Sequence, residues 1–122
     1  MMRLTETDFG GARPIEGYGP GHWRVGGTAI SGHVLVTGTG ARAWGGYDDL
    51  PPLVALAGEV DVLFIGTGAA IAHPPAPFRA ALETAGLAIE AMDSAAAART
   101  YNVLLSEGRR VAAALLVVGP AR

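Results

Sequence analysis

The clearest candidate for chemistry is a glycine loop, Gly66-Thr67-Gly68, which follows the apolar run Val60–Ile65. Ligands of open α/β sheets bind beyond the carboxyl ends of the strands, and backbone amides freed by glycine can cradle an anion there. A dinucleotide fingerprint needs a third glycine that opens a helix directly, and residues 69–77 intervene here. Two interpretations stay open, an anion-binding loop or a tight turn, and no cofactor is predicted.

A second group of polar residues, Asp93, Arg99 and Asn102, lies at or within the segment 93–106. Asp93 follows a strand-like run, so it can lie beside the glycine loop across neighbouring strands. Arg99 and Asn102 are three residues apart, share one helix face, and would suit a carboxylate or a partner surface. The alternative is that Asp93 caps the helix, Arg99 is a solvated charge and Asn102 bonds locally.

A third set, Arg42, Trp44 and Arg109, consists of candidate contact residues. An exposed Trp beside Arg is the composition of an interaction hot spot. The alternative, which we favour, is that Trp44 folds over the open end of a small sheet. Arg109 can complement the negative end of the preceding helix, or it can belong to a surface patch.

Several kinds of chemistry lack the residues that they need. The chain has no cysteine, which removes disulfides, thiolate metal sites and cysteine nucleophiles. All nine cationic side chains are Arg, which excludes a Schiff-base lysine and a Walker-type loop. The three histidines have no metal-ligand spacing, so no metal is predicted. No Ser/His/Asp set stands out, so no catalytic residue is named, and we lean against an enzyme.

Composition points to one soluble domain, 1–122, with residues 1–14 as a loose N-terminal arm. Half of the 122 residues are hydrophobic and 16% are charged, which is enough for one sizeable core. The net charge of −2 and the lack of a basic stripe argue against a nucleic-acid partner. No apolar run is long enough for a signal peptide core or a transmembrane helix. A cytoplasmic location is therefore predicted.

The two halves of the chain differ in the spacing of their apolar residues and glycines. Short β-type runs with glycine punctuation between residues 15 and 39 predict an antiparallel meander, with strands near 22–25, 28–31 and 33–37. A helix is expected after Asp49, which can cap it ahead of Pro51-Pro52.

The second half alternates strands and helices. The expected elements are a strand at 60–65, a helix from about Pro77 to Ala85, a strand at 87–92, a helix at 94–106 and a strand at 110–118. Such a βαβαβ order predicts right-handed crossovers onto one sheet.

Several ordered segments carry a resemblance to a known family. The segments are 62–68, 89–94, 99–104 and 107–115, together with Trp44 and Asp49-Leu50. They resemble the family that includes mitochondrial complex I assembly factor 3 and the adipogenesis-associated domain protein. The resemblance implies an α/β fold, a three-layer domain around a mixed central sheet. Some members carry Cys where this chain has Ala98, and the family provides no established catalytic residues.

Two hypotheses of function follow. The first is a non-enzymatic interaction or assembly factor with an unknown protein partner and a possible homodimer, although transferring an assembly role from a mitochondrial relative rests on analogy. The second is a small-anion binder or enzyme that uses the amides of Gly66–Gly68 with Asp93 and Arg99. We rank the first ahead of the second.

Overall fold

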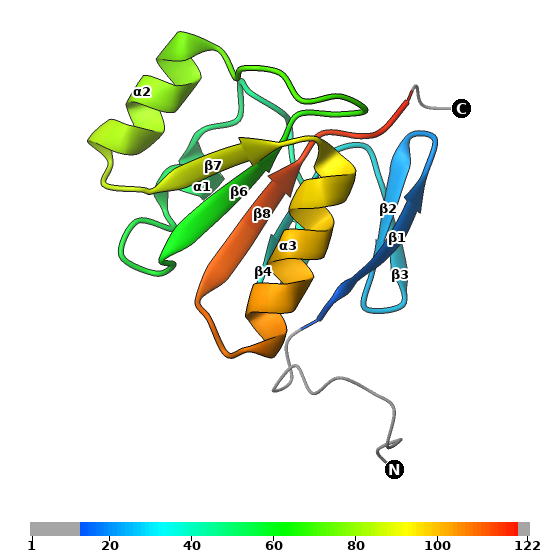
Figure 1. Ribbon diagram of the computed structural model, residues 1–122. Coiled ribbons are helices and arrows are strands. Elements are labelled where there is room, and N and C mark those ends of the chain that lie inside the picture. The colour runs from blue at the N-terminus through cyan, green and yellow to red at the C-terminus, as the bar shows by residue number, and fades with distance from the viewer. Residues whose placement is uncertain (1–12, 120–122) are drawn as a thin grey trace.

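A mixed five-stranded sheet forms the middle layer of the molecule (Figure 1). The computed structural model describes residues 13–119, so the arm predicted for residues 1–14 lies outside the described residues except for its last two. Within the described chain the strands and helices are β1 (Ile15–Gly19), β2 (His22–Val25), β3 (Thr28–Ser31), β4 (Val34–Thr37), β5 (Gly40–Ala43), α1 (Pro51–Val54), β6 (Val62–Gly66), α2 (Ala76–Thr84), β7 (Ile89–Met92), α3 (Ser94–Ser106) and β8 (Val111–Leu115).

The five strands lie in the order β5-β4-β8-β6-β7. β7 and β8 both run parallel to β6, whereas β4 is antiparallel to β8 and β5 is antiparallel to β4. The chain moves outward from β6 to β7 through α2, and then back across β6 to β8 through α3. Right-handed crossovers in these two directions place the two helices on opposite faces of the sheet. The predicted βαβαβ half is confirmed.

Each face of the sheet buries its own apolar core. The first core lies under α3 and the meander, and its largest side chains, Trp23 and Tyr101, are fully buried. The second lies under α1 and α2, which contribute Leu53, Phe78 and Leu82. Successive residues of β8 point alternately into the two cores, as the pleat of a strand requires. The result is the three-layer arrangement that the resemblance implies.

The N-terminal meander consists of β1, β2 and β3, paired antiparallel. The prediction that residues 33–37 extend this meander is wrong, because β4 pairs with β8 and β5 in the other sheet. Gly32 has a φ of +82°, which only glycine adopts without strain, and the chain turns there from one sheet into the other. β5, which the sequence analysis did not identify, then completes a hairpin with β4.

Asp49 and Asp93 are both predicted to cap a helix, and only Asp93 does so. The Asp93 carboxylate accepts a hydrogen bond from the Ala96 amide at 3.1 Å, and α3 covers the predicted range. The Asp49 carboxylate instead accepts from the Gly45 amide at 2.9 Å. The N-cap of α1 is Leu50, and its side chain makes no capping bond. The adjacent prolines, which suit a first helical turn, remain as the local start signal of α1.

One side chain ties the meander to α3. Asn102 Oδ1 accepts a hydrogen bond from Ile15 N at 2.9 Å, and Asn102 Nδ2 donates to Ile15 O at 2.7 Å. These two bonds satisfy both backbone groups of Ile15, as a neighbouring strand would. The interpretation that Asn102 bonds locally is therefore wrong, because its partner lies at the start of β1.

We expect Asn102→Ala to lower the free energy of unfolding by about 2 kcal/mol, because it leaves both backbone groups of Ile15 unpaired. Arg99→Ala, an exposed position on the same helix, should change it by no more than about 0.5 kcal/mol. Urea denaturation measures both, and hydrogen exchange at the Ile15 amide provides the local readout. Equal stability and equal exchange in the two variants would contradict the role given to Asn102.

Candidate functional site

The glycine loop after β6 is joined to α3 and to the segment after β8 by one buried hydroxyl. Ser94 Oγ accepts a hydrogen bond from Gly68 N at 2.8 Å and donates to Leu116 O at 2.7 Å. Ser94 N also donates to Gly68 O at 2.8 Å. Ser94 is fully buried, so the start of α3 is held against the loop from within the protein.

Thr67 closes the same loop on itself. Its amide donates to Met92 O at 2.8 Å. Its hydroxyl accepts from Ala72 N at 3.1 Å and lies within bonding distance of two carbonyl oxygens, Ala70 O at 2.8 Å and Met92 O at 3.1 Å. The amides of Thr67 and Gly68 are thus both engaged within the protein, and the loop has the contacts of a tight turn. An anion-binding role for it stays a prediction.

The second predicted group divides into three separate environments. Asp93 does lie beside the glycine loop, as the bond from Ser94 N to Gly68 O shows, but its carboxylate caps α3. Asn102 is bound to β1. Arg99 is exposed, and it has no hydrogen bond or ion pair among residues 13–119. Asp93 and Asn102 are therefore used to hold elements together, and only Arg99 offers a free polar group.

Trp44 is buried, at 4% exposure, in the core under α1 and α2. Its indole N–H donates to Asp49 O at 2.9 Å. The rings of Tyr47 and Phe78 each lie 6.3 Å away from it between centroids. The Trp44 ring is thus buried in the core, and it is not the exposed Trp that an interaction hot spot would need.

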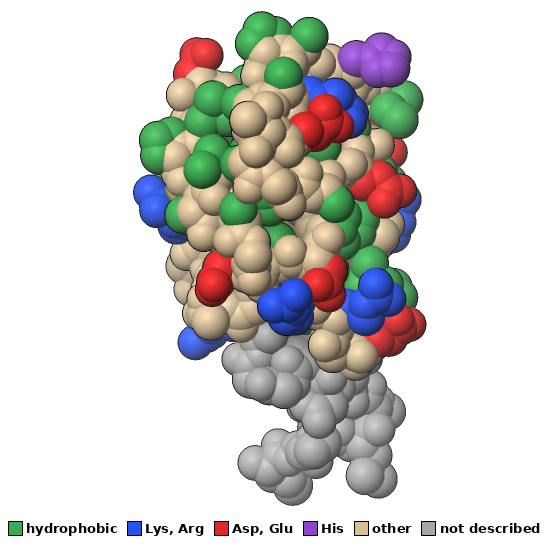
Figure 2. Space-filling model, turned by 90° about the vertical axis from the view of Figure 1, so that its left-hand side faces the viewer, with side chains coloured by type: hydrophobic (Ala, Val, Ile, Leu, Met, Phe, Trp, Pro, Cys, Tyr) green, Lys and Arg blue, Asp and Glu red, His purple; other side chains and the backbone are tan. Residues whose placement is uncertain are grey.

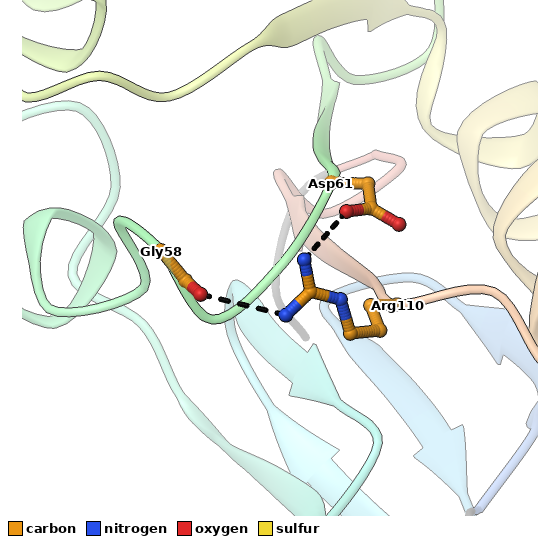
Figure 3. A network of polar contacts seen from close by, with 3 residues as sticks. All are labelled: Gly58, Asp61 and Arg110. Atoms are coloured by element: carbon orange, nitrogen blue, oxygen red, sulfur yellow. Dashed lines mark hydrogen bonds and ion pairs between the residues drawn. The ribbon is translucent and has the colours of Figure 1, made fainter.

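Arg109 and Arg110 are adjacent, and their side chains have different surroundings. Arg110 lies 2.8 Å from Asp61 Oδ1 through Nη2 and 3.5 Å from Gly58 O through Nη1 (Figure 3). It thereby ties the start of β8 to the segment before β6. Arg109 is exposed, and in the described part of the chain its guanidinium has no such partner.

Three adjoining hollows surround the β4–β5 hairpin. The first, of about 290 Å³, is lined by Thr39 and Arg109 among others. The second, of about 220 Å³, includes Thr39 and Arg42. The third, of about 330 Å³, includes Arg42 and Arg13. Neighbouring hollows share lining residues, and we call the three together the arginine groove, defined by Arg13, Arg42 and Arg109.

Residues 13–119 contain neither a cluster of metal ligands nor a membrane-spanning helix. No three His, Asp or Glu side chains in this part of the chain lie close enough together to bind a metal ion. None of the helices described has the length and hydropathy of a membrane-spanning segment.

Comparison with known proteins identifies the family. A family model described as a protein of unknown function (DUF498/DUF598) matches residues 15–116, which is nearly the whole of the described chain. The chain belongs to the DUF498/DUF598 family. An uncharacterized protein of Rhodobacter capsulatus is 54% identical over 94% of this chain and 93% of its own length. The NADH dehydrogenase (ubiquinone) 1 alpha subcomplex assembly factor 3 of Danio rerio is 32% identical over 98% of this chain and 72% of its own length.

Solved structures share the fold of this DUF498 chain. An outer membrane protein from Bartonella henselae is 32% identical, with a TM-score of 0.78 over 88% of this chain and 97% of its own. A Mth938-like domain of Bordetella pertussis is 27% identical, with a TM-score of 0.76 over 98% and 95%. The resemblance to the family of complex I assembly factor 3 is thus confirmed.

Two structural roles in this DUF498 chain escaped the sequence analysis. Ser94 is not singled out in the sequence analysis, although its place after a strand and near a glycine loop is a signal for a bridging hydroxyl. His33 Nδ1 accepts a hydrogen bond from Val117 N at 3.0 Å, and burial lowers the pKa of the His33 imidazole. Nothing local signals this bond, because the two residues are 84 positions apart in the sequence.

Gly66→Ala should destabilise the protein by about 3 kcal/mol. A Cβ at this position would lie 2.7 Å from Ser94 Oγ and 2.9 Å from Ser94 Cα, so backbone must move to admit it. Gly38→Ala is the matched control, because a Cβ there meets nothing within 4 Å, and it should change stability by no more than about 0.5 kcal/mol. Thermal and urea unfolding measure both variants. Equal tolerance of the two substitutions would refute the close packing of Gly66 on Ser94.

The stability of the fold should fall as pH drops below the ordinary imidazole pKa of 6.5. The folded state lowers the pKa of His33, so the unfolded chain binds more protons between the two values, and this contribution is fully present only above 6.5. Protonated Nδ1 also cannot accept the Val117 bond. Urea unfolding at about pH 5 and about pH 7.5 measures the difference.

His33→Asn should flatten this pH dependence, because Asn retains an acceptor without titrating in this range. His73→Asn, at an exposed position, should leave it unchanged. A pH profile unaffected by His33→Asn would refute the assignment.

Proposed function

We propose that this protein is a non-enzymatic interaction domain that assists the assembly of a protein complex. The observation that carries the proposal is the similarity to the Danio rerio assembly factor over 98% of this chain. That relative assists assembly of NADH dehydrogenase by its name, so a respiratory complex of this kind is the first candidate client. The cytoplasmic location predicted from the sequence belongs to the same proposal.

The use of polar side chains supports an interaction domain over an enzyme. Asp93 and Asn102, which the sequence predicts as site residues, and Ser94 form their hydrogen bonds with backbone groups of the protein. A catalytic group instead needs a titratable side chain aimed at a space where substrate can bind. The charged side chains that are exposed and have no partner within residues 13–119, such as Arg42, Arg99 and Glu90, lie scattered over the surface.

The small-anion alternative has less support. Of its proposed donors, the amides of Gly66–Gly68, those of Thr67 and Gly68 are bonded to Met92 O and Ser94 Oγ. Its proposed carboxylate, on Asp93, caps a helix. An anion would have to displace these bonds, each of which contributes about 1 kcal/mol to stability.

The test is the state of the protein's candidate clients in cells that lack it. We expect deletion of the gene to stall one multi-subunit complex as a smaller subassembly, seen by native electrophoresis with quantitative mass spectrometry. Re-expression of the natural chain should restore the complex. Arg24→Ala, at an exposed position on β2 outside the arginine groove, serves as the control for a surface substitution and should restore it equally.

A direct readout follows from capture of the tagged protein. The subassembly that accumulates in the deletion strain should be enriched with the tagged chain. Normal assembly of every complex in the deletion strain, together with a changed pool of a small anionic metabolite, would overturn the proposal in favour of the alternative.

A further inference from the structure

We propose that the open edge of β5 binds an extended acidic segment of a protein partner as an added strand. The inference rests on the proposed function and supplies the surface and the chemistry of the partner. β5 is the first strand of the sheet, and in the part of the chain that the structure describes it pairs with one strand, β4. β3 lies near β5, but the two are not hydrogen-bonded strands of one sheet.

The pairing of the hairpin fixes which backbone groups of β5 face outward. Trp44 N donates to His33 O at 2.9 Å, and in an antiparallel pair hydrogen-bonded and non-bonded residue pairs alternate. Arg42 therefore bonds to β4, whereas Ala41 and Ala43 direct their N–H and C=O groups away from it. Ala43 is exposed. These groups form the row of donors and acceptors that an added strand uses.

The hollows on the two sides of β5 match the alternation of an added strand. Arg42 is opposite Leu35 and shares its face of the sheet, the side of the second hollow. Ala41 packs with the core under the meander, the side of the third hollow, where Arg13 lies. Successive side chains of an added strand point to opposite faces. They would thus enter the two hollows in turn, with Arg42 in reach of both.

The charged side chains that line the hollows indicate which kind of strand would bind at β5. Of the described residues, Arg13 and Arg42 but no acidic residue line the second and third hollows, and Glu59 is the one acid that lines the first. Within residues 13–119, Arg13 Nη1 donates to a backbone oxygen, Gly26 O, at 3.1 Å. The side of the molecule that carries α2 and the β7 edge differs, because basic and acidic side chains are interspersed there (Figure 2). The arginine groove therefore favours carboxylates.

A second copy of this chain is a poorer occupant. Two β5 edges paired about a two-fold axis would bring Arg42 of one copy toward Arg42 of the other across a strand of only four residues. Like charges facing each other across a strand pair are destabilising. An acidic strand would instead attract Arg42, and it would form the same hydrogen bonds with the outward backbone groups of β5.

The experiment uses the full chain and a short fluorescent peptide in which Thr alternates with Glu, measured by anisotropy. We expect binding that weakens with salt and that is lost when Gln replaces Glu in the peptide. Arg42→Glu should weaken binding by about tenfold or more. Arg24→Gln, an exposed arginine on β2 outside the groove, is the matched control and should stay within about twofold.

A second variant tests the backbone. Ala43→Pro removes an outward N–H without removing a bond to β4, and proline is tolerated at such edge positions. Circular dichroism should show that it folds, and its peptide affinity should fall by about tenfold. Binding that is lost in Arg42→Glu but kept in Ala43→Pro would overturn strand addition. Equal binding of the Glu and Gln peptides, or by all variants, would overturn the whole inference.

The inference and the proposed function fail in different ways. A client captured equally by the natural chain and by Arg42→Glu would overturn the role of the groove and leave the proposed function intact. A peptide bound at β5 as described, by a protein whose deletion leaves every complex assembled, would overturn the proposed function instead.

Discussion

The burial of β8 is the constraint from which the rest of the sheet follows. All five of its residues, Val111–Leu115, are buried, so its backbone groups have no access to water and must be paired on both edges. β6 pairs with one edge in parallel, and β4 pairs with the other antiparallel. The mixed sheet is the outcome, and the open edges are moved outward to β5 and β7. Three consecutive alanines in β8 also let the covering layers approach closely.

Because the layers pack closely, buried backbone groups at the ends of the strands also need hydrogen-bond partners. This need explains why the residues of the predicted site hold the fold together. Where α3 and the meander pack on the sheet, backbone ends are buried without water and need side-chain partners. Ser94 meets this need at the end of β6, and Asn102 meets it at the start of β1. In the sequence such residues resemble a ligand site, because the donors and acceptors that bind a ligand are the same ones that satisfy a backbone.

The sequence predicted well those elements whose ends and faces are set by residues close to one another in the chain. The α3 range follows from a capping Asp93, apolar spacing and a terminal Gly108, all of which act within one helix. Asp49 has the same local signal, but the Gly45 amide takes its carboxylate, and no pattern reveals that competition. The pairing of β4 with β8, the bond from Val117 to His33 and the clamp of Asn102 on Ile15 all join distant parts of the chain. Periodicity carries no information about such partners, so the βαβαβ half was predicted well and the placement of β4 was not.

The two open edges are protected against self-pairing by charge. β5 carries Arg42 and β7 carries Glu90, and both side chains are exposed. Pairing through either edge with its own copy would bring like charges together across a short strand. Pairing of β5 with β7 of the next copy would match the charges, but such a head-to-tail contact builds a filament unless its rotation closes a ring. These edges therefore contribute little to the stability of the homodimer that the sequence predicts from exposed β elements. An acidic strand from another protein would pair with the free backbone groups of β5, complement the charge of Arg42 and end the sheet.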